Sequence, residues 1–146
     1  MIHKSEEIMN KYQGDALHTD LYQINMGYAY FKDGIHERKS YFDVYFRKIP
    51  FGGGYAVFAG LAKIIDYVNS FEFSESDIDF LRELGYAEDY LDYLSKMKFT
   101  GNIRCVQEGE IVFGNEPLLR IEAPLIQAQI METAILNIAV CNFLFP

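Results

Sequence analysis

The first strong pattern in the chain is helical. Apolar side chains recur at roughly helical spacing over residues 21–31 and predict a helix there. Thr19 is a good N-cap, Asp20 in the first turn suits the positive end of the helix dipole, and Gly34 can end the helix. The apolar positions of this helix are Leu21, Ile24, Met26, Tyr28 and Phe31.

The pattern then changes from helical spacing to alternation. Strongly apolar residues alternate with tyrosines and charged residues over residues 41–47, which predicts a strand with one apolar face. Pro50 and the glycine run 52–54 break this strand. The residues on its apolar face are Phe42, Val44 and Phe46.

Three further helices are predicted in the middle of the chain. The first covers about residues 61–70. Ser74 and Asp77 resemble a capping box that begins the second helix, which ends near Gly85. The third spans about residues 89–97.

A β-rich stretch and a final helix follow. Residues 103–123 form short apolar runs around the turns 108–110 and 115–117, as is typical of strands. Pro124 suits the first turn of a long helix. Because strands and helices are segregated after residue 60, the layout predicts an α+β fold more than a doubly wound sheet.

The composition restricts the possible partners. The net charge is −8 and the pI is near 4.8, so the surface repels phosphate backbones and we expect no nucleic-acid binding. A few local cations can still make a site for a small anion. The 146 residues, half of them hydrophobic, suffice for one core.

No segment of the sequence has the pattern of a signal peptide or a membrane span. The apolar-rich stretch 130–145 contains Glu132 and is too short and too polar to cross a bilayer. Cys105 and Cys141 have no partner pattern, and we interpret them as core residues in a reduced compartment. We therefore expect a cytoplasmic protein that does not contact membranes.

Asp20 and Tyr22 allow two interpretations. Asp20 can help to start the helix, and Tyr22 can be a core aromatic residue with its hydroxyl at the surface. Alternatively, Tyr22 stacks on an aromatic ligand, while Asp20 accepts a hydrogen bond from a ring N–H or orients a neighbouring cation. Residues two apart do not share a helix face, so both serve one site only at the start of the helix.

Arg47 and Lys48 also allow two interpretations. They are either the solvated end of the predicted strand, or Arg47 forms a bidentate clamp for a phosphate or carboxylate. The glycine run 52–54 matches neither common phosphate-loop pattern, so a tight turn is its simpler interpretation. We predict neither a metal site nor a catalytic triad around the histidines, which are His3, His18 and His36.

Six blocks of sequence, taken in order, resemble nicotinate phosphoribosyltransferase. No block is decisive alone, but the ordered set is highly specific. The resemblance implies NAD salvage, in which nicotinate and phosphoribosyl pyrophosphate form nicotinate mononucleotide with ATP hydrolysis and Mg²⁺. It also implies the N-terminal α/β sandwich domain of a type II phosphoribosyltransferase, without the α/β barrel that follows in the family, and a head-to-tail homodimer. The blocks are residues 19–23, 46–61, 73–85, 99–101, 115–120 and 132–137.

The resemblance also assigns roles to the candidate residues. It implies that Tyr22 stacks on nicotinate from across the dimer interface and that Asp20 helps to fix the ring. Arg47, and with it Lys48, would line the approach of the phosphate. The family's phosphorylated histidine and phosphoribosyl-binding loops belong to the barrel, so no catalytic residue and no Mg²⁺- or ATP-binding motif is expected in this chain.

The resemblance divides the chain into three parts. We expect a flexible N-terminus over residues 1–15, the phosphoribosyltransferase domain over 16–138 and a divergent apolar tail over 139–146. Because the tail departs from the family pattern, we expect a truncated product that is inactive alone.

Two other functions stay open. A non-catalytic dimerisation or interaction module would use the apolar segment 140–145 as its contact surface. The turn-rich stretch 109–124 also resembles a biotinyl or lipoyl carrier domain, which needs an exposed lysine at a hairpin tip. Lys96 and Lys98 have the matching Lys-Met-Lys pattern but close a predicted helix, and the chain is longer and more helical than a carrier domain.

Overall fold

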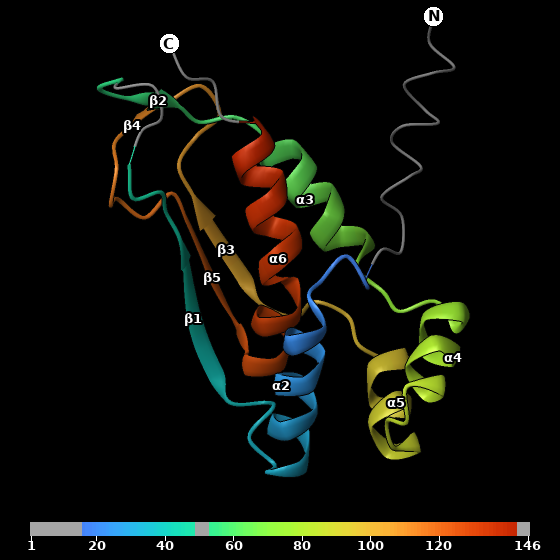
Figure 1. The fold of residues 1–146 in the computed structure, drawn as a ribbon. Coiled ribbons are helices and arrows are strands. Elements are labelled where there is room, and N and C mark those ends of the chain that lie inside the picture. Colours follow the sequence, from blue (N-terminus) through green and yellow to red (C-terminus); the bar gives the residue numbers. More distant parts are fainter. Residues whose placement is uncertain (1–15, 49–52, 143–146) are drawn as a thin grey trace, which may run out of the picture.

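The computed structural model of the chain describes residues 16–48 and 53–142, with only the backbone described for residues 140–142. Figure 1 shows an antiparallel sheet covered on one face by one long helix, against which two further helices pack, with a short helical hairpin to one side. The elements are α2 (Leu21–Lys32), β1 (Lys39–Val44), β2 (Ala56–Val57), α3 (Leu61–Ser70), α4 (Glu75–Glu83), α5 (Glu88–Ser95), β3 (Asn102–Cys105), β4 (Ile111–Val112), β5 (Leu119–Pro124) and α6 (Leu125–Asn142).

β5 is the central strand of the larger sheet. The strand order is β1-β5-β3, and β5 runs antiparallel to both neighbours. Leu119, Ile121 and Ala123 alternate along β5 and are buried in the core that this sheet shares with α6. Asp43 and Arg120 lie opposite each other on β1 and β5, where two hydrogen bonds of 2.6 and 2.7 Å join their exposed side chains. The sheet therefore has one buried face and one polar face.

α6 occupies the middle of the fold because it is apolar around most of its circumference. It packs against β1 and β5 on one side and against α2 and α3 on the other. A helix that is apolar all round needs such a buried position. Its fully buried residues include Ile126, Ala128, Ile130, Met131, Ala134 and Ile135.

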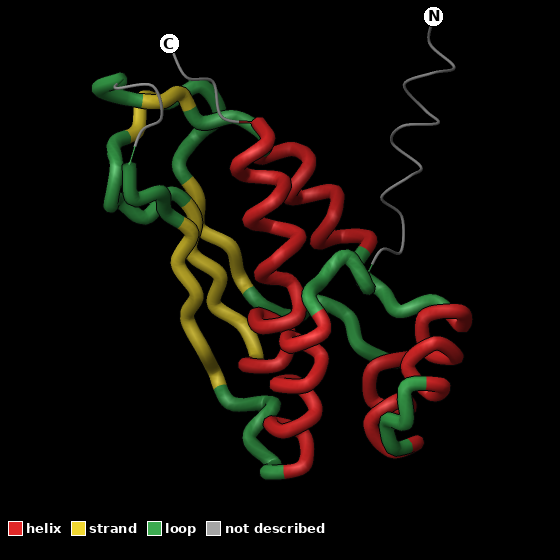
Figure 2. Tube along the Cα trace, in the orientation of Figure 1, coloured by secondary structure: helices red, strands yellow, loops and turns green. Residues whose placement is uncertain are grey.

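A second, smaller core lies beyond the main sheet. β2 and β4 pair as a two-stranded antiparallel sheet at one end of the molecule, apart from the three-stranded sheet (Figure 2). This small sheet covers the buried side chains of Ala56, Phe58, Val112 and Leu118.

Most of the predicted elements are confirmed. The fold is mixed α and β, and α3 spans the residues expected of it. Ser74 and Asp77 form the predicted capping box at the start of α4. Gly34 and Gly85 have positive φ values of 67° and 92° directly beyond α2 and α4, the backbone conformation that glycine adopts most readily at a helix end.

The predicted N-cap of α2 is wrong by one residue. Asp20 is the N-cap, with extended backbone, but its side chain makes no capping hydrogen bond. The hydroxyl of Thr19 instead donates to the backbone carbonyl of Ile130 at 2.9 Å, because α6 lies against this corner. Both side chains that could cap the helix, Thr19 and Asp20, therefore bond to residues of α6 instead.

Two predicted boundaries in the β segments also shift. β1 ends at Val44, so Phe46 lies beyond the strand and packs against the smaller core. Pro124 is the last residue of β5, and α6 begins one position later. The chain thus passes directly from β5 into α6, without a loop.

The three-part division of the chain stays a prediction. Residues 1–15 lie outside the described residues, and the boundary expected after residue 138 falls inside α6, which continues to Asn142. Within residues 16–48 and 53–142, no helix combines the length and the apolar character that a membrane crossing requires.

Candidate functional site

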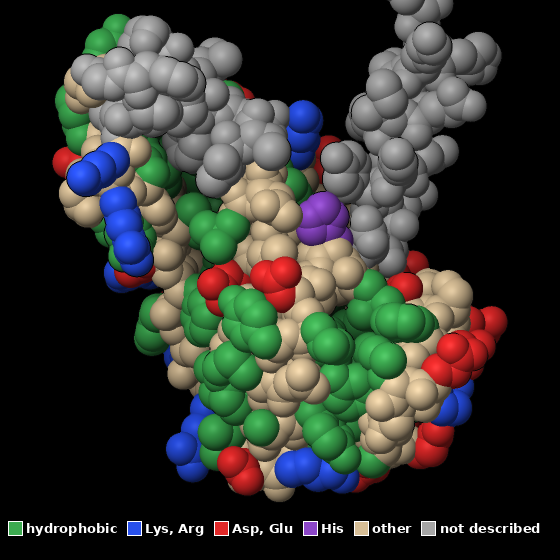
Figure 3. All heavy atoms as spheres, viewed as in Figure 1, with side chains coloured by type: hydrophobic (Ala, Val, Ile, Leu, Met, Phe, Trp, Pro, Cys, Tyr) green, Lys and Arg blue, Asp and Glu red, His purple; other side chains and the backbone are tan. Residues whose placement is uncertain are grey.

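Asp20 and Tyr22 lie where α2 begins against the middle of α6. Thr133 on α6 donates a hydrogen bond of 3.1 Å to the carboxylate of Asp20. The side chain of Tyr22 is half exposed, at 50%. In Figure 3, acidic side chains sit among hydrophobic ones on the face of the molecule that contains this junction. The structure therefore brings the predicted carboxylate and the predicted aromatic ring to one exposed surface.

Tyr22 rests on a polar side chain that the sequence did not single out. The amide nitrogen of Gln23 donates to the Tyr22 hydroxyl at 2.7 Å, and Gln23 itself is fully buried at 0% exposure. The same nitrogen donates to Glu132 on α6 at 3.3 Å, and Gln129 on α6 donates to the amide oxygen of Gln23. A buried polar network thus reaches the surface at Tyr22.

The surroundings of Tyr22 favour its neutral form. Partial desolvation of the hydroxyl, followed by the negative charges of Glu132 and Asp20, raises the pKa of Tyr22 above its usual value. Donation from Gln23 opposes this shift because it stabilises the phenolate. The phenol is therefore fully protonated at neutral pH and presents an O–H group beside an exposed aromatic face.

Arg47 and Lys48 lie at a different part of the molecule. Both are exposed in a bend beyond β1. The bend is fastened to the segment after β4, since the side-chain amide of Asn115 donates to the Arg47 carbonyl and its backbone N–H donates to the Phe46 carbonyl. Figure 1 shows this end of β1 well separated from the start of α2. Within one chain, Arg47 and Lys48 therefore do not lie beside Asp20 and Tyr22. Their role in binding phosphate stays a prediction.

The N-terminus of α3, six residues after the glycine run, offers no open phosphate cradle. Gly60, with φ at 103°, is the N-cap of α3, and the carboxylate of Glu108 accepts hydrogen bonds from the N–H groups of Gly60 and Leu61, both at 2.8 Å. A helix N-terminus attracts anions, and here the chain's own carboxylate fills that place. Pro50 and Gly52 lie outside the described residues.

The histidines make no metal centre in the described part of the chain. His18 shares a hydrogen bond of 3.1 Å with Asn137, and His36 packs between the rings of Phe31 and Tyr93. Within residues 16–48 and 53–142, no three His, Cys, Asp or Glu side chains group closely enough to hold a metal ion. These residues therefore do not fit a Mg²⁺ site. His3 lies outside the described residues.

The carrier-domain interpretation is wrong. Lys96 follows directly after α5 and pairs with Asp92, one turn earlier, at 2.7 Å. Lys98 pairs with Glu72, in the segment between α3 and α4. Neither lysine stands at a hairpin tip, where a carrier domain presents its modified residue.

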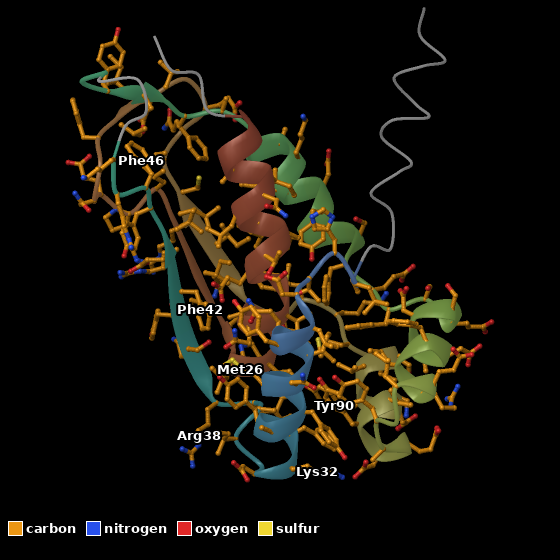
Figure 4. The ribbon with its side chains drawn as sticks, viewed as in Figure 1. Met26, Lys32, Arg38, Phe42, Phe46 and Tyr90 are labelled. Carbon is orange, nitrogen blue, oxygen red and sulfur yellow. The ribbon has the colours of Figure 1, made fainter. Side chains whose placement is uncertain are left out.

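The sequence interpretation missed the polar residues that support Tyr22. Gln129 and Glu132 lie on α6, a helix whose buried residues are mostly apolar. Isolated glutamine and glutamate side chains in such a pattern need hydrogen-bond partners. That signal marks Gln129 as a buried polar position, but it does not identify Gln23 as its partner. Figure 4 shows α2 and α6 side by side along this junction.

Comparison with known proteins gives a consistent result. Residues 17–139 match the family model described as the nicotinate phosphoribosyltransferase (NAPRTase) N-terminal domain. The chain is 56% identical over 124 residues to nicotinate phosphoribosyltransferase of Bacillus subtilis (strain 168), covering 84% of this chain and 25% of that protein. It is 43% identical over 121 residues to the Dictyostelium discoideum protein of the same name, covering 81% and 20%.

A solved structure shares the fold. The crystal structure of human nicotinic acid phosphoribosyltransferase superposes with a TM-score of 0.77 at 30% identity, covering 83% of this chain and 25% of that one. The chain therefore spans a fifth to a quarter of the length of the relatives it matches.

Proposed function

Because the chain belongs to the nicotinate phosphoribosyltransferase N-terminal domain family, we propose that it supplies this domain's part of an enzyme that joins nicotinate to phosphoribosyl pyrophosphate. The products of that reaction are nicotinate mononucleotide and pyrophosphate. The observation that carries the proposal is the family match over residues 17–139, which includes the junction of Asp20 and Tyr22 with α6. The chain contributes binding groups, and the groups that carry out the chemistry at the ribose belong to the rest of such an enzyme.

The role we propose for Tyr22 is to stack on the nicotinate ring. Its aromatic face is half exposed, and its hydroxyl is fixed by Gln23. Aromatic stacking of this kind contributes about 0.5–1.5 kcal/mol beyond the burial of apolar area. When the ring nitrogen bonds to the ribose, the ring becomes a cationic pyridinium. The negative charges of Asp20 and Glu132 nearby favour that form electrostatically.

The role we propose for Arg47 and Lys48 is to guide the phosphate groups. Both side chains are exposed, and they lie apart from Tyr22 in one chain. A single site that uses both pairs would therefore combine the Tyr22 surface of one chain with the Arg47 surface of another. This separation supports the head-to-tail homodimer that we propose for the assembled enzyme in the cytoplasm.

Mg²⁺ and ATP have no part in the steps that we assign to this chain. The described side chains do not group as metal ligands, and the N-terminus of α3 is filled by Glu108. If the assembled enzyme uses Mg²⁺ and couples the reaction to ATP, those groups act through the remaining part of the enzyme. In this chain, Asp20 and Tyr22 bind and orient the ring, and Arg47 and Lys48 guide the phosphate groups.

A domain exchange tests the proposal. Residues 17–139 would replace the matched segment in the Bacillus subtilis relative, and the hybrid would be assayed for nicotinate mononucleotide with labelled nicotinate and phosphoribosyl pyrophosphate. The hybrid should be active, whereas the 146-residue chain alone should form no product. A folded hybrid without activity would contradict the proposed function. Self-association of the chain with an inactive hybrid would favour a non-catalytic interaction module.

A further inference from the structure

Gln23 is fully buried, and its amide donates to the exposed Tyr22 at the proposed substrate surface. We propose that Gln23 is a positioning residue which, together with Gln129 and Glu132, holds the Tyr22 hydroxyl as a hydrogen-bond donor directed at the bound ligand. This inference rests on the proposed function and adds a supporting layer of residues behind the nicotinate-stacking ring.

Every hydrogen-bonding group of the two glutamine amides is used. Gln23 Nε2 donates to the Tyr22 hydroxyl at 2.7 Å and to Glu132 Oε2 at 3.3 Å, so both of its N–H bonds have acceptors. Gln129 Nε2 donates to Gln23 Oε1 and to Glu132 Oε2, the latter at 3.4 Å. The hydroxyl of Tyr30 donates to Gln129 Oε1 at 3.1 Å. A buried network in which each member is satisfied is rigid.

Glu132 fixes the direction of the whole network. An ionised carboxylate only accepts hydrogen bonds, so the amide nitrogens of Gln23 and Gln129 must both face it. Flipping the Gln23 amide would place its oxygen against Glu132 and leave Gln129 without its acceptor. The orientation in which Gln23 donates to Tyr22 is therefore the only one that satisfies all of these groups.

This direction determines what Tyr22 offers to a ligand. Because its oxygen accepts from Gln23, the hydroxyl hydrogen points elsewhere, and within the described residues no acceptor for it is found. The raised pKa of Tyr22, caused by partial desolvation and by Glu132 and Asp20, keeps that hydrogen in place. The ligand chemistry that fits is an acceptor atom beside the stacked ring and close to the plane of the phenol, since a phenolic O–H lies in the plane of its own ring.

The positioning role can be tested on the chain itself by NMR. With tyrosine labelled at Cζ, the Tyr22 signal would be assigned through Tyr22→Phe and followed against pH in wild type and in Gln23→Met. Methionine keeps the length of the side chain but removes the amide. The Tyr22 signal should shift, and its pKa should rise because the donor is lost. The matched control is Gln127→Met, since Gln127 is also buried, at 5% exposure, but bonds to Thr100.

A second experiment measures the steady-state kinetics of the hybrid enzyme. Gln23→Met should raise the KM for nicotinate about tenfold and leave kcat within about twofold, the pattern of lost ground-state binding. Tyr22→Phe should raise the KM for nicotinate by a similar factor. The double variant should have a KM no higher than either single variant, because both substitutions remove the same directed hydrogen bond. Gln127→Met should leave the KM unchanged.

The possible failures are distinguishable. An unchanged Tyr22 signal in Gln23→Met overturns the positioning role, whatever the hybrid does. A changed signal with an unchanged nicotinate KM in an active hybrid also overturns it. An inactive wild-type hybrid contradicts the proposed function instead. If Gln23→Met does not fold, the Tyr22→Phe hybrid provides the test. An unchanged KM for nicotinate in that variant overturns the role of the Tyr22 hydroxyl as a donor.

Discussion

The hydroxyl of Thr133 donates to the carboxylate of Asp20 at 3.1 Å and joins the middle of α6 to the start of α2. Thr19 adds a second bond at the same corner, to the backbone carbonyl of Ile130. Together these bonds set where α2 begins along α6. They therefore set where Tyr22 stands on the surface, two residues after Asp20.

Removing the Thr19 hydroxyl should destabilise the fold. Thr19→Val keeps the shape of the side chain but removes the hydroxyl that donates to the carbonyl of Ile130, and the loss of this partly buried hydrogen bond costs about 1 kcal/mol of unfolding free energy. Urea denaturation followed by circular dichroism measures the change. Thr133→Val is the control, since its bond to Asp20 is exposed and water can replace it. An equal loss in both variants would contradict this account of the corner.

Gly101 should not tolerate a side chain. A Cβ there would lie 2.5 Å from the backbone oxygen of Glu122 and 2.6 Å from the Cβ of Ala123, and backbone atoms of the central strand have little freedom to move. Gly101→Ala should lower the unfolding free energy by about 2 kcal/mol, as overpacked sites do. Gly54→Ala has no atom within 4 Å of its added carbon and should stay near the wild-type value in the same denaturation experiment. Similar values for both would contradict the close approach.

The ion pair between Asp43 and Arg120 should make stability depend on acid pH. Hydrogen bonds from Arg120, which outweigh its Coulomb attraction, lower the pKa of Asp43 below its unfolded value. A carboxylate whose pKa is lower in the folded state stabilises the fold at pH values above its unfolded-state pKa. This stabilisation is lost as the pH falls through the folded-state pKa. Denaturation midpoints of wild type and Asp43→Asn should differ modestly at pH 6 and converge near pH 2. A difference that persists at pH 2 would argue against this pair as its cause.

The thiol of Cys105 should react slowly at ordinary pH. Burial, with smaller contributions from Glu108 and Glu110, raises the pKa of Cys105 to about 11. Because the thiolate is the nucleophile, alkylation by iodoacetamide should remain slow at pH 8 and accelerate toward pH 11. Mass spectrometry would follow this in the Cys141→Ser variant, so that Cys105 is the cysteine observed. Fast labelling at pH 8 would contradict the buried environment.

The sequence was sufficient to predict elements that local chemistry controls. The capping box of Ser74 and Asp77 and the glycines that end α2 and α4 act through neighbouring residues, so their signals can be read along the chain. The position of Thr19 could not be predicted in this way. Its hydroxyl bonds to Ile130, 111 residues later, and that contact exists only after α6 has packed.

The candidate site was predictable in part for the same reason. Asp20 and Tyr22 follow from the start of one helix and from the family resemblance. Gln23 looked like an ordinary helical residue because its partners, Gln129 and Glu132, come from α6. The separation of Arg47 from Tyr22 also depends on the length and direction of β1 in the folded sheet, which spacing along the sequence does not reveal.

The most direct measurement is the catalytic efficiency for nicotinate of the hybrid enzyme with Tyr22→Ala. Loss of a stacking ring should lower kcat/KM about 30-fold, the equivalent of about 2 kcal/mol. Tyr41→Ala is the control, because Tyr41 is similarly exposed, at 57%, but lies on β1. A large loss for Tyr22→Ala with little change for Tyr41→Ala would support the account. Full efficiency in Tyr22→Ala would contradict the claim that this surface binds the substrate ring.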